Sequence, residues 1–243
     1  MLRNLTASGG VLVALTLMAM PDKTTAVPLI DTLSSWDGTT NIFDFGEPDT
    51  ATYGQTFTVS GPEAQLDRFT VLVNDFENPD VLDFEAYVYL WDAISFKPTG
   101  GALFSSGPLS SAADADADVF EAFAINTGGM QLISGNQYVA FFTTSNLFDG
   151  VEGSGNFAAS QNADPYADGA FVFLNNGSDF GSLFTTPWDT CDVGPNCFVG
   201  RNGNLDLAFT AAFSTAEVPE PGTLALLGLG LAGLGFTRRR TAN

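Results

Sequence analysis

The sequence predicts an all-β protein, an antiparallel β-sandwich of jelly-roll type, with an N-terminal signal helix and a short C-terminal hydrophobic helix. Apolar and polar residues alternate with period two in several segments of the 243-residue chain. Turn signals separate these segments, and no amphipathic helical pattern lies between them. Because strands follow strands without intervening helices, the pattern favours antiparallel pairing in two packed layers. The number of strands and the unequal loops favour jelly-roll topology.

The N-terminus is predicted to be a secretory signal peptide over residues 1–26. Arg3 precedes the apolar run Val11–Met20, and the small residues Thr24, Thr25 and Ala26 follow it. A basic start, a short apolar core and small residues at the exit are typical of a segment that signal peptidase removes. The domain expected to fold therefore covers residues 27–217.

Strands are expected along the whole of this body. In order they are Gln55–Val59, Leu66–Val73, Leu82–Trp91, Ala102–Ser105, Val119–Ile125, Gln137–Thr144, Ala170–Leu174 and Leu205–Phe213. Turns are predicted at Lys97–Gly101, Ser134–Asn136 and Asn175–Gly177.

The strand Leu82–Trp91 has the clearest alternation. Its even positions form an aliphatic face, and its odd positions begin acidic and end with Tyr87, Tyr89 and Trp91. Rings of Tyr and Trp on one strand face can stack on sugar rings, which makes these three residues a candidate glycan platform. The alternative is that this face is covered by the second sheet or by a loop. The 22 phenylalanines, which have no polar group, are expected mainly in the core.

Two acidic regions raise the question of calcium. Asp114, Asp116 and Asp118 resemble the start of a calcium loop, but Val119 and Ile125 stand where an EF-hand needs Gly and Glu. We expect a solvated acidic turn, no cofactor and no metal ligand set, with calcium as the alternative. The second region, 146–169, is expected to be a long loop whose carboxylates and Tyr166 either meet a ligand or are disordered.

Cys191 and Cys197 flank a Gly-Pro-Asn sequence. In an exported chain such a close pair is expected to form a disulfide that closes the loop. By loop entropy this bond would contribute about 2 kcal/mol to stability.

Composition excludes several functions. The chain has no histidine, so Ser-His-Asp catalysis and His-ligated zinc or haem are excluded. Residues 27–217 contain 26 acidic and three basic residues, a net charge of about −23. Such a surface repels nucleic acids, which are bound mainly through Lys and Arg.

The C-terminus, residues 218–243, carries three ordered elements. Pro219, Glu220 and Pro221 are followed by the apolar run Leu224–Phe236 and then by Arg238, Arg239 and Arg240. The prolines keep their segment extended, as a protease or transpeptidase cleft requires. The apolar run would span about 20 Å as a helix, which is short for a membrane about 30 Å thick. The arginines would hold the end in the cytoplasm.

This tail resembles the PEP-CTERM sorting signal of Gram-negative bacteria. The resemblance implies that exosortase, a membrane-embedded cysteine transpeptidase, reads Pro219–Pro221 and removes the hydrophobic segment. It further implies a transient stay in the inner membrane and delivery to the outer surface or the extracellular matrix. The body loosely resembles secreted β-sandwiches of carbohydrate-binding type.

The sequence therefore predicts a non-catalytic, exosortase-sorted surface or matrix protein that associates with exopolysaccharide. One alternative is a calcium-dependent carbohydrate-binding module. The other is a glycosidase or polysaccharide lyase that uses paired carboxylates, and no motif selects such a pair.

Overall fold

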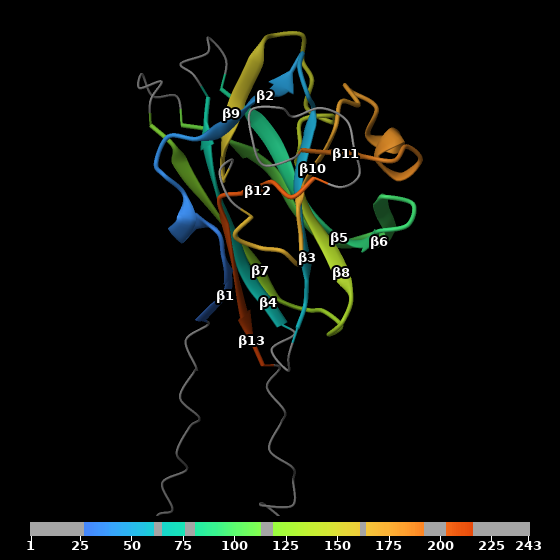
Figure 1. Cartoon of the computed structure of the whole chain (residues 1–243). Helices are drawn as coiled ribbons and strands as arrows, with labels where there is room; N and C mark the ends of the chain where they lie inside the picture. The colour runs from blue at the N-terminus through green and yellow to red at the C-terminus, as the bar shows by residue number, and fades with distance from the viewer. Residues whose placement is uncertain are drawn as a thin grey trace, which may run out of the picture.

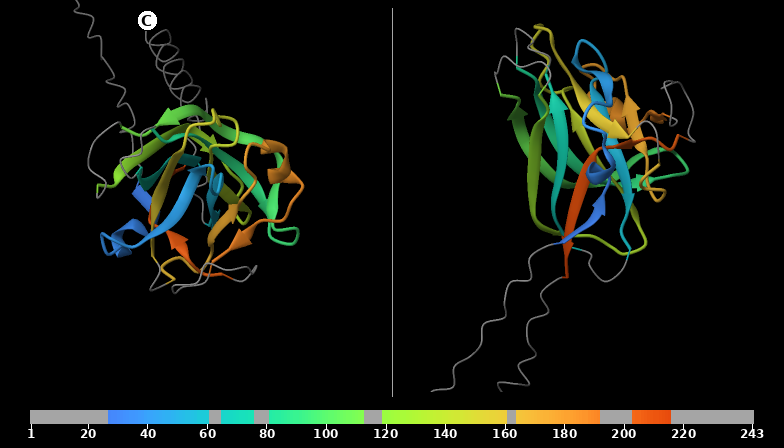
Figure 2. Two further views of the ribbon diagram at one scale, coloured as in Figure 1. Left: turned by 90° about the horizontal axis from the view of Figure 1, so that it is seen from above. Right: turned by 60° about the vertical axis from the view of Figure 1, so that its left-hand side comes forward.

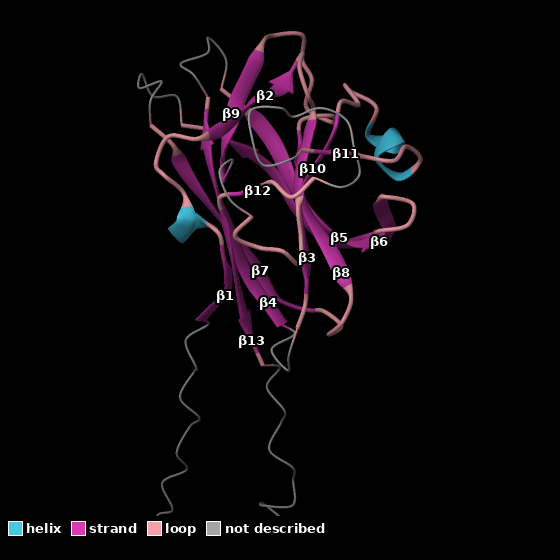
Figure 3. Ribbon diagram, in the orientation of Figure 1, coloured by secondary structure: helices cyan, strands magenta, loops and turns pink. Residues whose placement is uncertain are grey.

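The computed structural model describes residues 27–60, 65–75, 81–112, 119–160, 164–191 and 203–215. The signal segment 1–26, the acidic run Asp114–Asp118, Cys197 and the whole sorting region from Pro219 to Arg240 lie outside these residues. Over the described part of the chain the regular elements are strands, apart from two short 3₁₀ turns on opposite sides in the view of Figure 3.

Two antiparallel sheets face each other, as the sequence predicts (Figures 1 and 2). The first sheet has the order β1-β13-β4-β9-β12, with β2 paired to β9 and β7 paired to β4; the second has the order β11-β10-β3-β8-β5-β6. The elements are β1 (Val27–Asp31), η1 (Leu33–Ser35), β2 (Asn41–Glu47), β3 (Thr52–Thr58), β4 (Gln65–Asn74), β5 (Asp83–Asp92), β6 (Lys97–Ser110), β7 (Glu121–Gln131), β8 (Gln137–Thr143), β9 (Gly153–Ser160), β10 (Phe171–Leu174), η2 (Phe180–Phe184), β11 (Asp189–Thr190), β12 (Asp206–Leu207) and β13 (Phe209–Ser214). From β3 to β10 the chain changes sheet at every connection except β5–β6.

The main core lies between the sheets and is rich in phenylalanine, as predicted. In β5 the even positions Phe84, Ala86 and Val88 are fully buried in it, so the predicted aliphatic face is confirmed. The largest side chains fully buried in this core are Phe45, Phe57, Phe69, Phe84, Phe142, Phe157 and Phe171. Many of their rings meet edge to face, for example Phe45 and Phe157 with centroids 4.8 Å apart.

Strand β9 corrects the expectation of a long loop over residues 146–169. Its sequence, Gly-Ser-Gly-Asn-Phe-Ala-Ala-Ser, has almost no large apolar residue, so alternation does not reveal it. Small size is what its position requires: a Cβ on Gly155 would lie 2.4 Å from the carbonyl oxygen of Asn74 on β4. The strand is buried beside β2 and β4 and divides the expected loop into two short ones.

The turn predicted at Lys97–Gly101 is also wrong. The reversal occurs at residues 93–96, and Lys97 already begins β6. Pro98 is tolerated there because, among the described strands, β6 is the last of its sheet and pairs with β5 alone. The turns at Ser134–Asn136 and Asn175–Gly177 are confirmed.

The first and last strands of the body lie side by side. Val27 in β1 is the register partner of Phe213 in β13, at the lower end of the molecule in Figure 1. The described chain therefore enters and leaves the sandwich at the same end.

Candidate functional site

Tyr87, Tyr89 and Trp91 share the outer face of the second sheet, but they do not form an open platform. Tyr89 is 7% exposed and Trp91 5% exposed, and only Tyr87 is partly open. A sugar ring needs an accessible ring face, so the structure corrects the predicted platform and supports the alternative of a covered face.

The cover is the segment from β10 to β11, which includes η2. Trp188, fully buried, packs edge to face on Trp91 and Phe141, with ring centroids 5.7 and 5.4 Å away. Phe180 and Phe184 of η2 contact Tyr87 and Tyr89. The result is a second hydrophobic cluster on the outside of this sheet: Tyr89, Trp91, Val139, Phe141, Val172, Leu174, Leu183 and Trp188.

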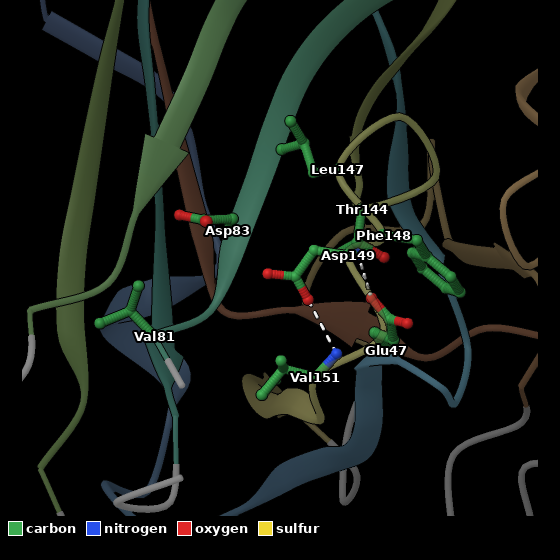
Figure 4. Close-up of a pocket in the computed structure, with 9 residues that line it drawn as sticks. Glu47, Val81, Asp83, Thr144, Leu147, Phe148, Asp149 and Val151 are labelled. Atoms are coloured by element: carbon green, nitrogen blue, oxygen red, sulfur yellow. Dashed lines mark hydrogen bonds between the residues drawn. The ribbon is translucent and has the colours of Figure 1, made fainter. Parts of the chain in front are cut away.

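An acidic pocket lies at the end of the sandwich where β2 ends and β5 begins (Figure 4). The Glu47 carboxylate accepts hydrogen bonds from the backbone N–H groups of Asp149 and Gly150, at 2.9 and 3.0 Å. Asp149 accepts in turn from the backbone N–H of Val151 at 2.8 Å. These carboxylates hold the 147–151 turn in place, which is a structural role.

Negative charge accumulates around this end. Burial raises the pKa of Asp49, and the neighbouring charges of Asp44 and Glu152 raise it further. Within the described ranges, no three acidic or cysteine side chains are close enough to hold a metal ion. Asp114–Asp118, on which the calcium alternative rests, lies outside those ranges.

The most unusual charged group was not singled out by the sequence. Asp206 is fully buried in β12, where it accepts a hydrogen bond from Gln55 Nε2 at 2.7 Å and from the backbone N–H of Tyr166 at 3.0 Å. Gln55, itself 1% exposed on β3, accepts from the Leu207 N–H at 2.8 Å. The pair thereby joins the two sheets through the core. Burial raises the pKa of Asp206 to about 7, although both hydrogen bonds oppose that shift.

No sequence signal distinguishes Asp206 from the other acidic residues of the body. Its position between two leucines is only a weak indication of burial. In the structure both neighbours, Leu205 and Leu207, are fully buried. The partner on β3 is 151 residues away, so only the fold brings the two side chains together.

Cys191 is buried at the end of β11, and Cys197 lies outside the described residues, so the disulfide stays a prediction. We expect the secreted protein to contain no free thiol until it is reduced. Intact-mass measurement after alkylation with and without reductant would show it. Two alkylated cysteines without reductant would mean that the loop is not bridged.

The described part of the chain contains no helix with the length and apolarity needed to cross a membrane. The predicted hydrophobic segment Leu224–Phe236 and the three arginines after it are not among the described residues.

Two solved structures are similar in shape to the body. One is a variant of the clostridial cysteine protease Cwp84 after propeptide cleavage, with a TM-score of 0.43 and 12% identity over 74% of this chain and 38% of that one. The other contains the cysteine protease and lectin-like domains of Cwp84, a surface layer associated protein of Clostridium difficile, with a TM-score of 0.41 and 12% identity over 69% and 32% of the two chains. This chain thus spans about a third of the length of either structure. No curated protein matches it.

The tail matches a family model. Residues 217–240 match the PEP-CTERM protein-sorting motif, a range that contains Pro219–Pro221, the apolar run and the arginine cluster. The chain therefore carries a PEP-CTERM protein-sorting motif, which follows a body of two antiparallel β-sheets.

Proposed function

We propose that this chain is a non-catalytic surface or matrix protein, sorted by exosortase after signal peptidase cleavage, whose body contacts exopolysaccharide outside a Gram-negative cell. The observation that carries the proposal is the sorting motif at residues 217–240. Such a motif implies export, and the protein's site of action is then the outer surface or the extracellular matrix.

The chemistry of the body supports a binding role. The chain has no histidine, and the carboxylates Glu47 and Asp149 of the acidic pocket already accept hydrogen bonds from backbone N–H groups. A carboxylate that closes a turn in this way is poorly placed to act as a general acid or a nucleophile. The high negative charge keeps the protein soluble by self-repulsion and is compatible with a salty exterior.

Replacing Pro219, Glu220 and Pro221 together by alanine is expected to abolish processing. Without the prolines a helix can continue from about residue 216 through Phe236, which turns a processed tail into a better anchor. Fractionation and intact-mass analysis in the native host should find full-length protein in the inner membrane, with the melting temperature of the sandwich unchanged.

A matched control replaces Arg238, Arg239 and Arg240 by lysine, which keeps the three cations that orient the segment. This variant should still be processed. If the alanine variant reached the surface with its tail removed, the sorting proposal would be wrong.

A further inference from the structure

The described residues leave part of the outer face of the second sheet uncovered. Beyond Trp188 the same outer face continues as an open groove of about 420 Å³, a size within the usual range of small-molecule sites. Its floor is a row of three side chains on adjacent strands: Thr58 on β3, Gln137 on β8 and Trp91 on β5. The register sets this row, because Thr58 pairs with Gln137 and Leu90 pairs with Tyr138.

The two walls of the groove are fixed by backbone contacts. On one side, the segment 168–170 is hydrogen-bonded to β3: Thr58 Oγ1 donates to the Asp168 carbonyl at 2.9 Å, and the Thr56 N–H donates to the Ala170 carbonyl at 2.9 Å. On the other side stands Phe96, at the end of the reversal between β5 and β6. Both walls are therefore already in place before any ligand binds.

Phe96 has a strained backbone. Its φ of +56° lies in the left-handed region, which bulky residues rarely adopt. Two backbone hydrogen bonds hold it there, from its N–H to the Asp92 carbonyl at 2.7 Å and from the Trp188 N–H to its carbonyl at 2.8 Å. Its ring then meets Trp91 edge to face at 5.2 Å. Such strain concentrates at binding sites, where it fixes a contact residue.

The groove also contains polar groups without partners. Trp188 and Trp36 donate their indole N–H to the carbonyls of Leu183 and Thr40, whereas the Trp91 indole N–H makes no hydrogen bond to any described residue, although Trp91 is 5% exposed. The side chains of Gln137 and Asp168 also form no hydrogen bond within the described ranges. The Trp91 N–H is not among the buried polar atoms left without a partner, so a ligand hydroxyl in the groove can accept its hydrogen bond in place of water.

We infer that this groove binds a neutral sugar unit of a polysaccharide, with the partly exposed Phe96 contacting the sugar ring and with Gln137, Asp168 and the Trp91 N–H bonding its hydroxyls. This inference rests on the proposed contact with exopolysaccharide and gives that contact a location. Hydroxyls both donate and accept, so they suit an amide, a carboxylate and an indole N–H together. Anionic sugars are disfavoured because Asp168 in the groove is itself negative and none of the described residues that line the groove is a lysine or an arginine.

The test uses the full chain, kept in solution with a detergent that carries no sugar, and four probes: cellohexaose, maltohexaose, laminarihexaose and an alginate hexasaccharide. We expect at least one neutral probe to bind and change tryptophan fluorescence, and the uronate probe not to bind. Trp91→Phe keeps the ring but removes the N–H, and Gln137→Ala removes the amide. Each should weaken binding by about tenfold, the usual value of one hydrogen bond.

Trp36→Phe and Gln131→Ala are the matched controls, since both lie away from the groove, and they should bind like the unaltered chain. Circular dichroism of each variant shows that it is folded. If the unaltered chain bound none of the neutral probes, or if the Trp91 and Gln137 variants bound as tightly as it does, the groove assignment would be overturned. Because binding is measured on purified protein, it can fail while delivery to the surface succeeds, and the reverse, so the two proposals are tested separately.

Discussion

Trp188→Ala is expected to lower the free energy of unfolding by about 3–5 kcal/mol, the usual cost of removing a fully buried large aromatic side chain. Trp188 is 0% exposed, contacts the rings of Trp91 and Phe141, and donates its indole N–H to the Leu183 carbonyl at 2.9 Å. The cavity would lie between the β10–β11 segment and the second sheet, and the ring contacts with Trp91 and Phe141 would be lost. Thermal melting of the purified chain should fall by roughly 6–20 °C.

Trp36→Ala is the matched control for this change. Trp36 follows η1, is half-buried, meets Phe120 edge to face at 5.1 Å and donates to the Thr40 carbonyl. Its removal should cost clearly less. Equal losses in the two variants would mean that the outer hydrophobic cluster adds little to stability, and that the covered face of Tyr87 and Tyr89 opens readily.

Stability is also expected to fall as the pH rises from 5 to 8.5, because of Asp206. Its pKa is raised by burial from the ordinary 3.8 to about 7, so between these values the folded protein binds more protons than the unfolded chain. The stabilisation is complete below pH 3.8 and is lost as the pH passes through 7. With one pKa unit equal to about 1.4 kcal/mol, the loss between pH 5 and 8.5 is about 2–3 kcal/mol.

Asp206→Asn isolates this contribution. The amide is neutral at every pH, so the difference in unfolding free energy between the unaltered chain and the variant should itself change by about 2–3 kcal/mol over this range. The variant loses one acceptor for Gln55 or Tyr166, and that cost is the same at each pH. Asp168→Asn removes an exposed carboxylate nearby and should leave the slope as it is. If the difference in unfolding free energy between the unaltered chain and Asp206→Asn did not change with pH, Asp206 would ionise normally in the folded state.

The strands that the sequence predicted correctly are those whose side chains alternate in size and polarity. In β5, Phe84, Ala86 and Val88 face the core between the sheets, and Tyr87, Tyr89 and Trp91 lie opposite, as the period of two requires. Strand β9 was missed because Gly155 and the alanines near it give no alternation. Small residues are required there because the backbone of Asn74 on β4 lies close to Gly155, and the sequence of β9 alone does not reveal this contact.

In the candidate site, too, some features were predictable from the sequence and others depend on the tertiary fold. The alternation placed Trp91 on an outer sheet face, but nothing local indicated that Trp188, far along the chain, would cover most of that face. Asp206 and Gln55 are separated by 151 residues, and neither is unusual in its own segment. Their pairing, and with it the raised pKa, depends on how the two sheets pack.

The sequence by itself determined the all-β class, the acidic and histidine-free chemistry, and the sorting tail, because composition, period-two alternation and a short linear motif are local properties of the chain. The tertiary structure alone decided which outer face is covered, where the groove with Trp91, Gln137 and Phe96 opens, and which carboxylate is buried. The physical reason is that burial and accessibility belong to contacts between segments distant in sequence. These contacts form, and Asp206 loses its hydration, only when the two sheets pack against each other.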